Sequence, residues 1–299
     1  MSKWRNFYQK IKEHYQKEER KGVAYLYAFL RFLVILCLIR EILLGNYHNA
    51  FLCILTLFLF LLPFIISDKF NLKIPPLLET LLLLFIFSAE ILGEIQNFYG
   101  IFPHWDNILH TLNGFLAAGI GFSLVYLLNE SEKINLHLTP VFVALVSFCF
   151  SMTVGVLWEF FEYGADQITN SDMQKDTLVQ KISSVEFDGA KSNVPVVIQD
   201  INRTIIYYGE GKQEVIDGGY LDLGEIDTMQ DLIVNFIGAA TFSTLGYFYI
   251  KTKKGYRLLE GFVVKKERPK RRKKEINQPK ASYFFFLLNS IISWTSQFK

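Results

Sequence analysis

The sequence contains only three cysteines among its 299 residues, Cys37, Cys53 and Cys149. Each falls inside an apolar run, where a thiol behaves as a small hydrophobic group. We therefore expect buried free thiols and no disulfide, and the cysteines indicate no particular redox compartment.

The sequence also lacks the short motifs of common catalytic and nucleotide-binding sites. It contains neither a Gly-x-Ser-x-Gly elbow nor a His-Glu-x-x-His pair. A Gly-x-Gly pattern at Gly119 and Gly121 lies inside an apolar run without a preceding strand, so it is no nucleotide motif. Net charge is small at +2, and the basic clusters lie beside apolar runs. That placement favours an orientation signal and excludes nucleic acid as the expected partner.

Long apolar runs are abundant, and 51% of the residues are hydrophobic. Several runs approach or reach the roughly 20 residues that cross a hydrocarbon core of about 30 Å. They lack the polar stripe of a soluble amphipathic helix. We therefore predict an all-α membrane protein in the lipid bilayer, with six transmembrane helices near 23–45, 49–67, 74–98, 107–129, 138–164 and 228–250.

Lysine and arginine are distributed unevenly over the predicted connections. They are dense in 1–22 and 251–274, and Lys69 and Lys73 lie in the second connection, whereas the first and third connections have none. Short basic loops stay in the cytoplasm. The pattern predicts a multi-pass protein of the cell membrane with both termini cytoplasmic. The polar start is too long for a cleavable signal, so we expect the first helix to be retained.

The chain divides into five predicted parts. They are a cytoplasmic basic segment (1–22), helices one to five (23–167), an extracytoplasmic insert (168–222), helix six (223–252) and a basic cytoplasmic tail (253–299). Runs rich in β-branched residues at 194–197, 204–208 and 214–216 predict a small hairpin or meander in the insert; the alternative is an irregular loop.

The tail contains a short apolar stretch, 281–294, which closely follows a polybasic run. This combination predicts a helix that lies on the cytoplasmic membrane surface and binds anionic lipids. The alternative is a short seventh or re-entrant helix.

Polar residues gather near the ends of the predicted spans, and ionisable residues at such positions usually mark function. Spacings of three, four or seven residues place those of one helix on a shared face. Under the predicted topology all of them lie at the extracytoplasmic side. The candidates for a metal or polar site are Glu90, Glu94, Asp106, His110, Glu159, Glu162, Asp166, Asp227, Asp231 and Asn235.

Carboxylates with a histidine suit a divalent cation, the one cofactor that we expect. The same groups could act as general acid and base, or coordinate a transported ion. The structural alternative is a set of hydrated helix ends, in which Arg40 pairs with the acids and Asp227 or Thr228 caps the sixth helix. Small residues such as Gly114 and Gly238 indicate close helix packing.

The polar residues form an ordered pattern. It comprises Asp106-x-x-x-His110-x-x-x-Gly114, Trp158-Glu159-Phe160-Phe161-Glu162 with Asp166, and Asp227-Thr228-x-x-Asp231-x-x-x-Asn235-x-x-Gly238. This pattern resembles the YjdF-like family of bacterial inner-membrane proteins and, more remotely, the VanZ-like family. The resemblance implies a small polytopic cell-membrane protein without an established reaction. VanZ-like proteins are associated with resistance to glycopeptide antibiotics. The long insert and the basic tail depart from the family pattern.

We therefore expect a cell-membrane protein of unknown activity, with an extracytoplasmic carboxylate/His site for a divalent cation. One alternative is an enzyme acting on lipid or cell-envelope headgroups, with Glu159, Glu162 and Asp231 as acid, base or ligands and His110 as ligand or proton shuttle. Another is a sensor or accessory protein in envelope stress or antibiotic resistance, with an envelope ligand or protein at the insert. A transporter is disfavoured, because the inner halves of the spans are uniformly apolar.

Overall fold

The computed structural model describes residues 5, 9–11, 13–14, 20–129, 138–252 and 257–266. The predicted surface helix at 281–294, with its anionic-lipid contacts, lies outside the described residues, as does most of the basic N-terminal segment.

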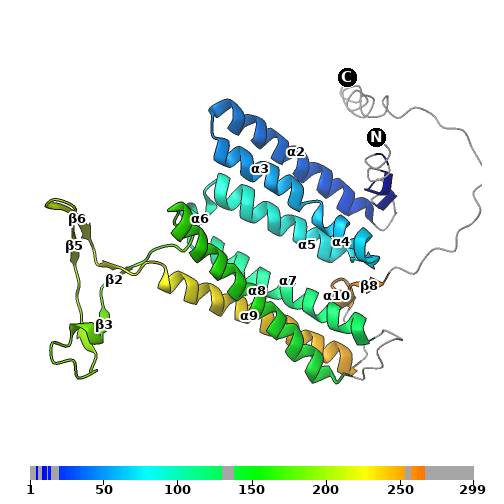
Figure 1. Ribbon diagram of the computed structural model, residues 1–299. Helices are drawn as coiled ribbons and strands as arrows, with labels where there is room; N and C mark the ends of the chain where they lie inside the picture. Colours follow the sequence, from blue (N-terminus) through cyan, green and yellow to red (C-terminus); the bar gives the residue numbers. More distant parts are fainter. Residues whose placement is uncertain are drawn as a thin grey trace, which may run out of the picture. The chain divides into compact units, whose positions relative to one another are not determined.

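The described residues contain six helical segments that are long and apolar enough to cross a membrane (Figure 1). This confirms the predicted all-α membrane fold. The segments are α2 (Lys21–Leu44), α3 with α4 (Tyr47–Phe70), α5 with η2 (Pro76–Ile95), α7 (Trp105–Asn129, of which Trp105–Leu128 is the candidate span), α8 (Pro140–Thr169) and α9 (Glu225–Thr252).

Two of these segments are irregular. The second is divided into α3 (Tyr47–Leu59) and α4 (Leu62–Phe70), and Pro63 lies in the first turn of α4. Proline has no N–H to donate to the preceding turn, so the break falls just before it. The third segment begins as α5 (Pro76–Ile86) and continues as a π-helix, η2 (Phe87–Ile95). Short α6 (Phe98–Ile101) connects it to α7.

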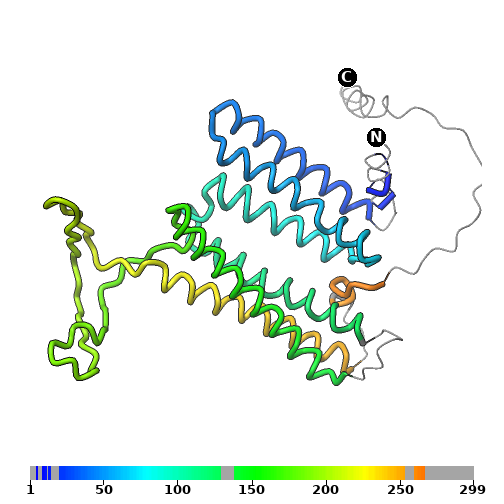
Figure 2. Tube along the Cα trace, viewed as in Figure 1, coloured from blue at the N-terminus to red at the C-terminus, as the bar shows by residue number. Residues whose placement is uncertain are grey.

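The helices pack in two groups, which the tube view separates clearly (Figure 2). In the first group α2 packs against α3, and α3 packs against η2; in the second, α7, α8 and α9 pack against one another. The first group buries residues such as Val34, Cys53 and Phe60. The second buries residues such as Phe122 and Phe242.

Close approach within the second group depends on two glycines. A Cβ atom at Gly114 would overlap the backbone carbonyl of Asn235, and one at Gly238 would overlap the carbonyl of Thr111. Side-chain hydroxyls add hydrogen bonds between α8 and α7: Ser151 donates to the Gly114 carbonyl at 2.7 Å. The predicted packing role of both glycines is therefore confirmed.

A stretch after α9 packs into the helices. It comprises α10 (Arg257–Glu260) and β8 (Lys265–Lys266), which pairs with β1 (Leu72–Lys73). Between them, Phe262, Val263 and Val264 are buried. The stretch falls within the predicted cytoplasmic tail (253–299), but its apolar residues lie among the helices, and Ser123 donates to the Phe262 carbonyl at 2.9 Å.

Between α8 and α9 the chain forms short antiparallel strand pairs. They are β2 (Leu178–Val179) with β7 (Tyr220–Leu221), β3 (Ile182–Ser184) with β4 (Val196–Ile198), and β5 (Arg203–Tyr208) with β6 (Lys212–Asp217); the 3-10 helix η3 (Val185–Phe187) follows β3. The predicted hairpin is confirmed in β5–β6, whose turn places Gly209 and Gly211 at positive φ.

The cysteines are free thiols, as predicted, but they differ in burial. Cys53 is buried and Cys37 is half-buried, whereas Cys149 is exposed on α8. The prediction of a buried thiol is wrong for Cys149, because an apolar position on a membrane helix can face lipid as well as protein.

Candidate metal centre

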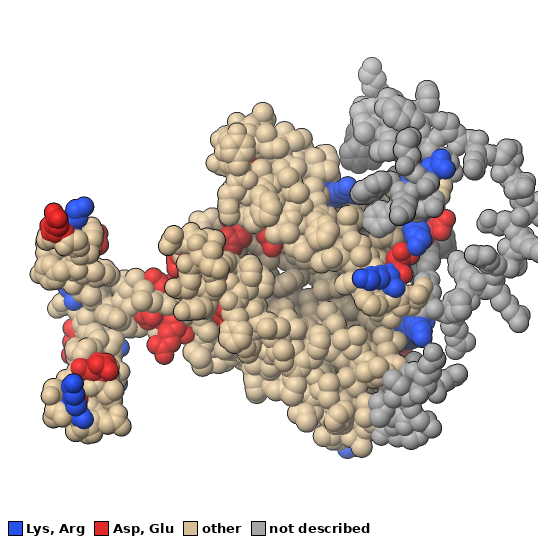
Figure 3. Space-filling view, viewed as in Figure 1, with Lys and Arg blue, Asp and Glu red and all other residues tan. Residues whose placement is uncertain are grey.

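The C-terminal end of α8 and the N-terminal ends of α7 and α9 meet beside the insert. In the space-filling view, acidic atoms gather at this end, and basic atoms lie toward the opposite end of the helices (Figure 3). His110 of α7, Glu159 and Glu162 of α8, and Asp231 of α9 are all buried here. Each offers one ligand atom, and these atoms lie within 4.8 Å of one another.

His110 lies at the centre of this group. Its Nε2 atom is 3.5 Å from Oδ1 of Asp106 and 3.6 Å from Oδ2 of Asp231. Its Nδ1 atom is 3.9 Å from Oε1 of Glu159. The Nε2 side of the ring therefore faces Asp106 of the same helix and Asp231 of α9, and the Nδ1 side faces Glu159 of α8. These separations exceed ordinary hydrogen-bond lengths of about 2.7–3.2 Å.

Two of the buried carboxylates have no hydrogen-bond partner. Glu159 and Asp231 are 5% and 1% exposed, and none of their four side-chain oxygens accepts a hydrogen bond of ordinary geometry from the protein. Polar side chains do lie near them: Thr228 and Gln174 near Glu159, and Asp106 near Asp231. Glu162 differs, since Trp158 donates its indole N–H to the Glu162 carboxylate at 2.8 Å. Buried polar groups in native proteins are nearly always hydrogen-bonded, so the two orphaned carboxylates require an explanation.

A second group shares Asp231 with the first. It consists of Asp106, Asp227 and Asp231, again with ligand atoms within 4.8 Å of one another. Together the two groups hold five carboxylates. Within the part of the chain that the structure describes, no Lys or Arg forms an ion pair with any of them; Lys175 pairs with Asp172 and Arg40 with Glu41. The predicted pairing of Arg40 with this cluster is therefore wrong.

Asp166 lies apart from these ligand groups, although it belongs to the predicted set. Its carboxylate accepts hydrogen bonds from the Met173 and Gln174 backbone N–H groups, at 2.7 and 2.9 Å, and from the Ser171 hydroxyl. Its acceptor positions are thus used to hold the start of the insert. Asp227 also helps to hold the start of the insert, because one of its carboxylate oxygens accepts a hydrogen bond from the Lys175 backbone N–H at 2.8 Å.

The cap of α9 is also different from the prediction. The helix begins at Glu225, earlier than expected, and Asp222 accepts a hydrogen bond from the Ile226 N–H at 2.9 Å. Capping by Asp227 or Thr228 is therefore wrong, and Asp227 is free to face Asp106 and Asp231. Further acidic residues lie in the parts of the insert next to α8 and α9. There, burial and the carboxylates of Asp172 and Asp222 raise the pKa of Asp176.

Asn235 lies one turn beyond Asp231 and is fully buried. Its amide oxygen accepts from the Asn113 side chain at 3.3 Å, and its amide nitrogen lies 3.6 Å from the Met152 sulfur. It supports the helix contact below the ligand groups and is not a member of either group.

Glu90 and Glu94 are the predicted residues that the structure does not bring into the cluster. Both lie on the π-helix η2; Glu90 is half-buried and Glu94 is exposed. Neither belongs to a ligand group. A neighbouring residue that the sequence analysis missed is Tyr99, whose pKa is raised by burial and by the carboxylates of Asp106 and Glu94. Its phenol therefore remains a proton donor beside the acids.

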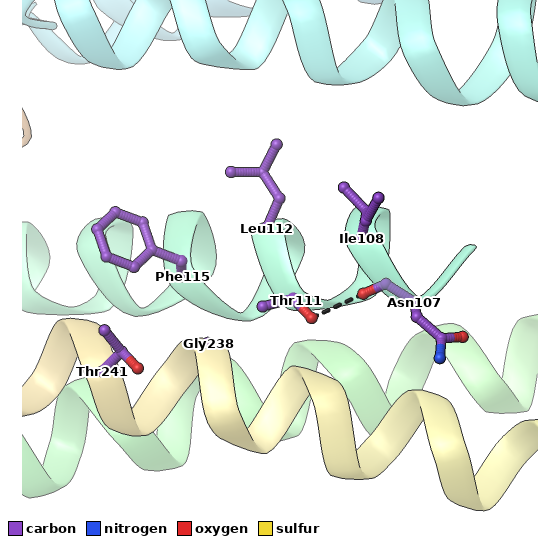
Figure 4. Close-up of a pocket in the computed structure, with 7 residues that line it drawn as sticks. All are labelled: Asn107, Ile108, Thr111, Leu112, Phe115, Gly238 and Thr241. Carbon is purple, nitrogen blue, oxygen red and sulfur yellow. Dashed lines mark hydrogen bonds between the residues drawn. The ribbon is translucent and has the colours of Figure 1, made fainter. Parts of the chain in front are cut away.

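A groove of about 460 Å³ adjoins the cluster along α7 and α9. Ile108, Leu112 and Phe115 point from α7 toward the helices that precede it in the chain (Figure 4). The groove's lining is predominantly apolar, and its residues are Asn107, Ile108, Thr111, Leu112, Phe115, Gly238 and Thr241.

Six apolar helices and a buried polar cluster at one end define a polytopic membrane protein. The chain belongs to a family of predicted membrane proteins, DUF2238, whose model matches residues 24–252. This confirms the resemblance to the YjdF-like family; the remoter VanZ-like resemblance stays a prediction. No curated protein and no solved structure is similar enough to the chain to count as a match.

Proposed function

We propose that the chain binds a divalent cation through His110, Glu159, Glu162 and Asp231. The observation that carries the proposal is the pair of buried, unpartnered carboxylates, Glu159 and Asp231. An ionised carboxylate without a partner costs several kcal/mol to bury, and a bound cation removes that cost. A cation would also screen the repulsion among the five carboxylates, none of which forms an ion pair with a described Lys or Arg.

The ligand types favour particular ions. Carboxylate oxygens suit Mg²⁺, Ca²⁺ and Mn²⁺, whereas an imidazole nitrogen favours transition metals and Zn²⁺. A set with one imidazole among carboxylates matches Mn²⁺, Fe²⁺ or Zn²⁺ better than Ca²⁺. The second group, Asp106, Asp227 and Asp231, has oxygen ligands alone and suits Mg²⁺ or Mn²⁺. Mn²⁺ is therefore the best single probe for both groups.

The proposal includes an orientation in the cell membrane. Lys10, Asp68, β1 and β8 lie together at the end opposite the cluster, and the basic residues Lys73, Lys265 and Lys266 belong to that end. Basic ends of short connections remain in the cytoplasm. The cation site then lies in the extracytoplasmic half of the membrane, and both termini lie in the cytoplasm.

The test is Mn²⁺ binding to the purified protein in mild detergent after treatment with EDTA. Calorimetry should detect binding to the wild type, and at 100 times Kd the ion should add about 2.7 kcal/mol to the free energy of unfolding. Asp231→Asn should weaken binding at least about tenfold, a loss of about 1.4 kcal/mol or more in binding free energy. Without cation, this variant should unfold at the same or a higher temperature than the wild type, because a buried charge has been removed.

Glu210→Gln is the matched control, since it also removes one carboxylate but lies exposed in the β5–β6 turn. It should bind Mn²⁺ as the wild type does. Absence of binding to the wild type would refute the proposal. So would unchanged binding by Asp231→Asn, and a variant that unfolds earlier than the wild type without any cation would assign Asp231 a structural role instead.

A further inference from the structure

One residue that lines the groove along α7 and α9 contacts the stretch that follows α10. This residue, Phe115, packs edge-to-face against Phe262 with ring centroids 5.3 Å apart. Phe262 is buried between the helices and also packs against Phe242 at 5.6 Å. The stretch after α10, which continues into β8, therefore packs beside the groove.

Residues that line the groove are close in sequence to two of the carboxylates. Asn107 lines the groove and directly follows Asp106 on α7. On α9, Asp231 precedes the lining residue Gly238 by seven residues, which is two helical turns on the same face. Asp106 and Asp231, ligands of the second group, thus lie near the groove along the same two helices, although neither of them lines it.

The surroundings of the groove identify the chemistry of its occupant. Both α7 and α9 are candidate membrane spans, so the groove lies at the depth of the lipid acyl chains. A molecule that fills it must be apolar along most of its length and polar where it meets the carboxylates. A cation held by carboxylates commonly completes its coordination with phosphate oxygens. Phospholipids combine these two features.

We propose that this groove binds one acyl chain of a phospholipid, whose phosphate reaches the cation held by Asp106, Asp227 and Asp231. The proposal rests on the cation site proposed above and names its ligand class. The shared carboxylate of Asp231 connects the phosphate-binding cation to the His110 group. A phosphate bound to this cation lies beside the carboxylates and His110. The headgroup of a lipid substrate would occupy the same position.

The experiment measures which lipid stays on the protein. Wild-type chain is reconstituted in nanodiscs of phosphatidylglycerol and phosphatidylcholine with identical acyl chains, and then extracted in detergent with either Mn²⁺ or EDTA. Mass spectrometry of the intact complex counts retained lipid. We expect phosphatidylglycerol to be retained in Mn²⁺, and EDTA to remove its advantage over phosphatidylcholine, because the cation then no longer attracts the anionic headgroup.

Ile108→Trp should fill the groove and lower lipid retention at least about tenfold while leaving Mn²⁺ affinity unchanged. Leu145→Trp is the matched control on α8, outside the groove; the two side chains are similarly exposed, at 58% for Ile108 and 56% for Leu145. Leu145→Trp should retain lipid as the wild type does.

The two proposals fail in different ways. Equal lipid retention by the two tryptophan variants, with Mn²⁺ still bound, would overturn the groove proposal alone. A dimer of the chain in place of a lipid complex, lost in Ile108→Trp, would overturn it too and assign the groove to a second copy. Absence of Mn²⁺ binding to the wild type would refute the cation site and the headgroup contact, whereas the effect of Ile108→Trp on acyl-chain retention would still test the groove.

Discussion

At the scale of single residues, two buried carboxylates of this protein have opposite surroundings. Asp231 has no hydrogen-bond partner and no ion pair with a described Lys or Arg, and the His110 imidazole lies 3.6 Å from it. Glu79, near the other end of the helices, is fully buried and is bound by the guanidinium of Arg20, which is itself 1% exposed. Arg20 also donates to the Ile74 carbonyl at 2.6 Å. One carboxylate is therefore paired with a cationic side chain, and the other has no such partner among the described residues.

Glu79→Gln should destabilise the protein by about 3–5 kcal/mol, because it leaves the Arg20 charge buried without its partner. Denaturant or thermal unfolding in mild detergent measures the loss. The double variant Arg20→Met/Glu79→Leu removes both charges and should recover most of it. A double variant as unstable as Glu79→Gln would contradict this account, and so would a single variant within about 0.5 kcal/mol of the wild type, the usual range for surface substitutions.

The sequence did not predict this ion pair, although it did predict most of the carboxylate cluster. Asp106, His110, Glu159 and Asp231 recur at helical spacings, so a shared face could be expected. Arg20 lies in a polar segment and Glu79 stands alone in an apolar one, and only the folded chain brings them together. The spacing also could not show that the Asp166 carboxylate accepts hydrogen bonds from backbone N–H groups of the insert.

At the scale of helices, hydropathy was sufficient to predict six spans, because each needs its own long apolar run. It could not predict the π-helical geometry of η2, the break before α4, or the packing of Phe262 between helices. These depend on which helices are neighbours, and length and composition do not determine that. The contact between α7 and α9 is an exception, since Gly114 and Gly238 mark it in the sequence.

Gly238→Ala should therefore separate α7 from α9. The added Cβ atom would overlap the Thr111 backbone carbonyl, which cannot rotate away as a side chain would. Overpacking of this kind typically costs about 1–3 kcal/mol. Because α7 carries Asp106 and His110 and α9 carries Asp231, Mn²⁺ affinity should fall together with thermal stability.

Gly164→Ala on α8 is the control for this substitution. No atom lies within 4 Å of the position of its Cβ, so the change should be neutral or should stabilise the helix by up to about 1 kcal/mol. Its Mn²⁺ affinity should remain that of the wild type. Equal stability of the two alanine variants would show that the α7–α9 contact is not as close as the glycine geometry indicates.

At the scale of the whole molecule, charge is divided between the two ends of the helices. The end that carries the insert holds the five carboxylates of the cluster, and the other holds Lys69, Lys73 and the Lys10–Asp68 ion pair at 2.8 Å. By the positive-inside rule, this division of charge predicts that the basic end of the helices faces the cytoplasm. The orientation decides whether a cation or a phospholipid headgroup reaches the cluster from outside the cell or from the cytoplasm, so it constrains both proposals.

Labelling of single cysteines with a membrane-impermeant maleimide tests the orientation. In a variant with Cys37, Cys53 and Cys149 replaced by alanine, Lys212→Cys places a thiol in the exposed β5–β6 hairpin, and Lys69→Cys places one at the basic end. Intact cells should label Lys212→Cys, whereas Lys69→Cys should react only after the membrane is permeabilised. The reverse pattern would place the carboxylates on the cytoplasmic side, and the cation and the phospholipid would then come from the inner leaflet. Labelling of both thiols in intact cells would contradict a fixed topology, because the two residues lie at opposite ends of the same set of spanning helices.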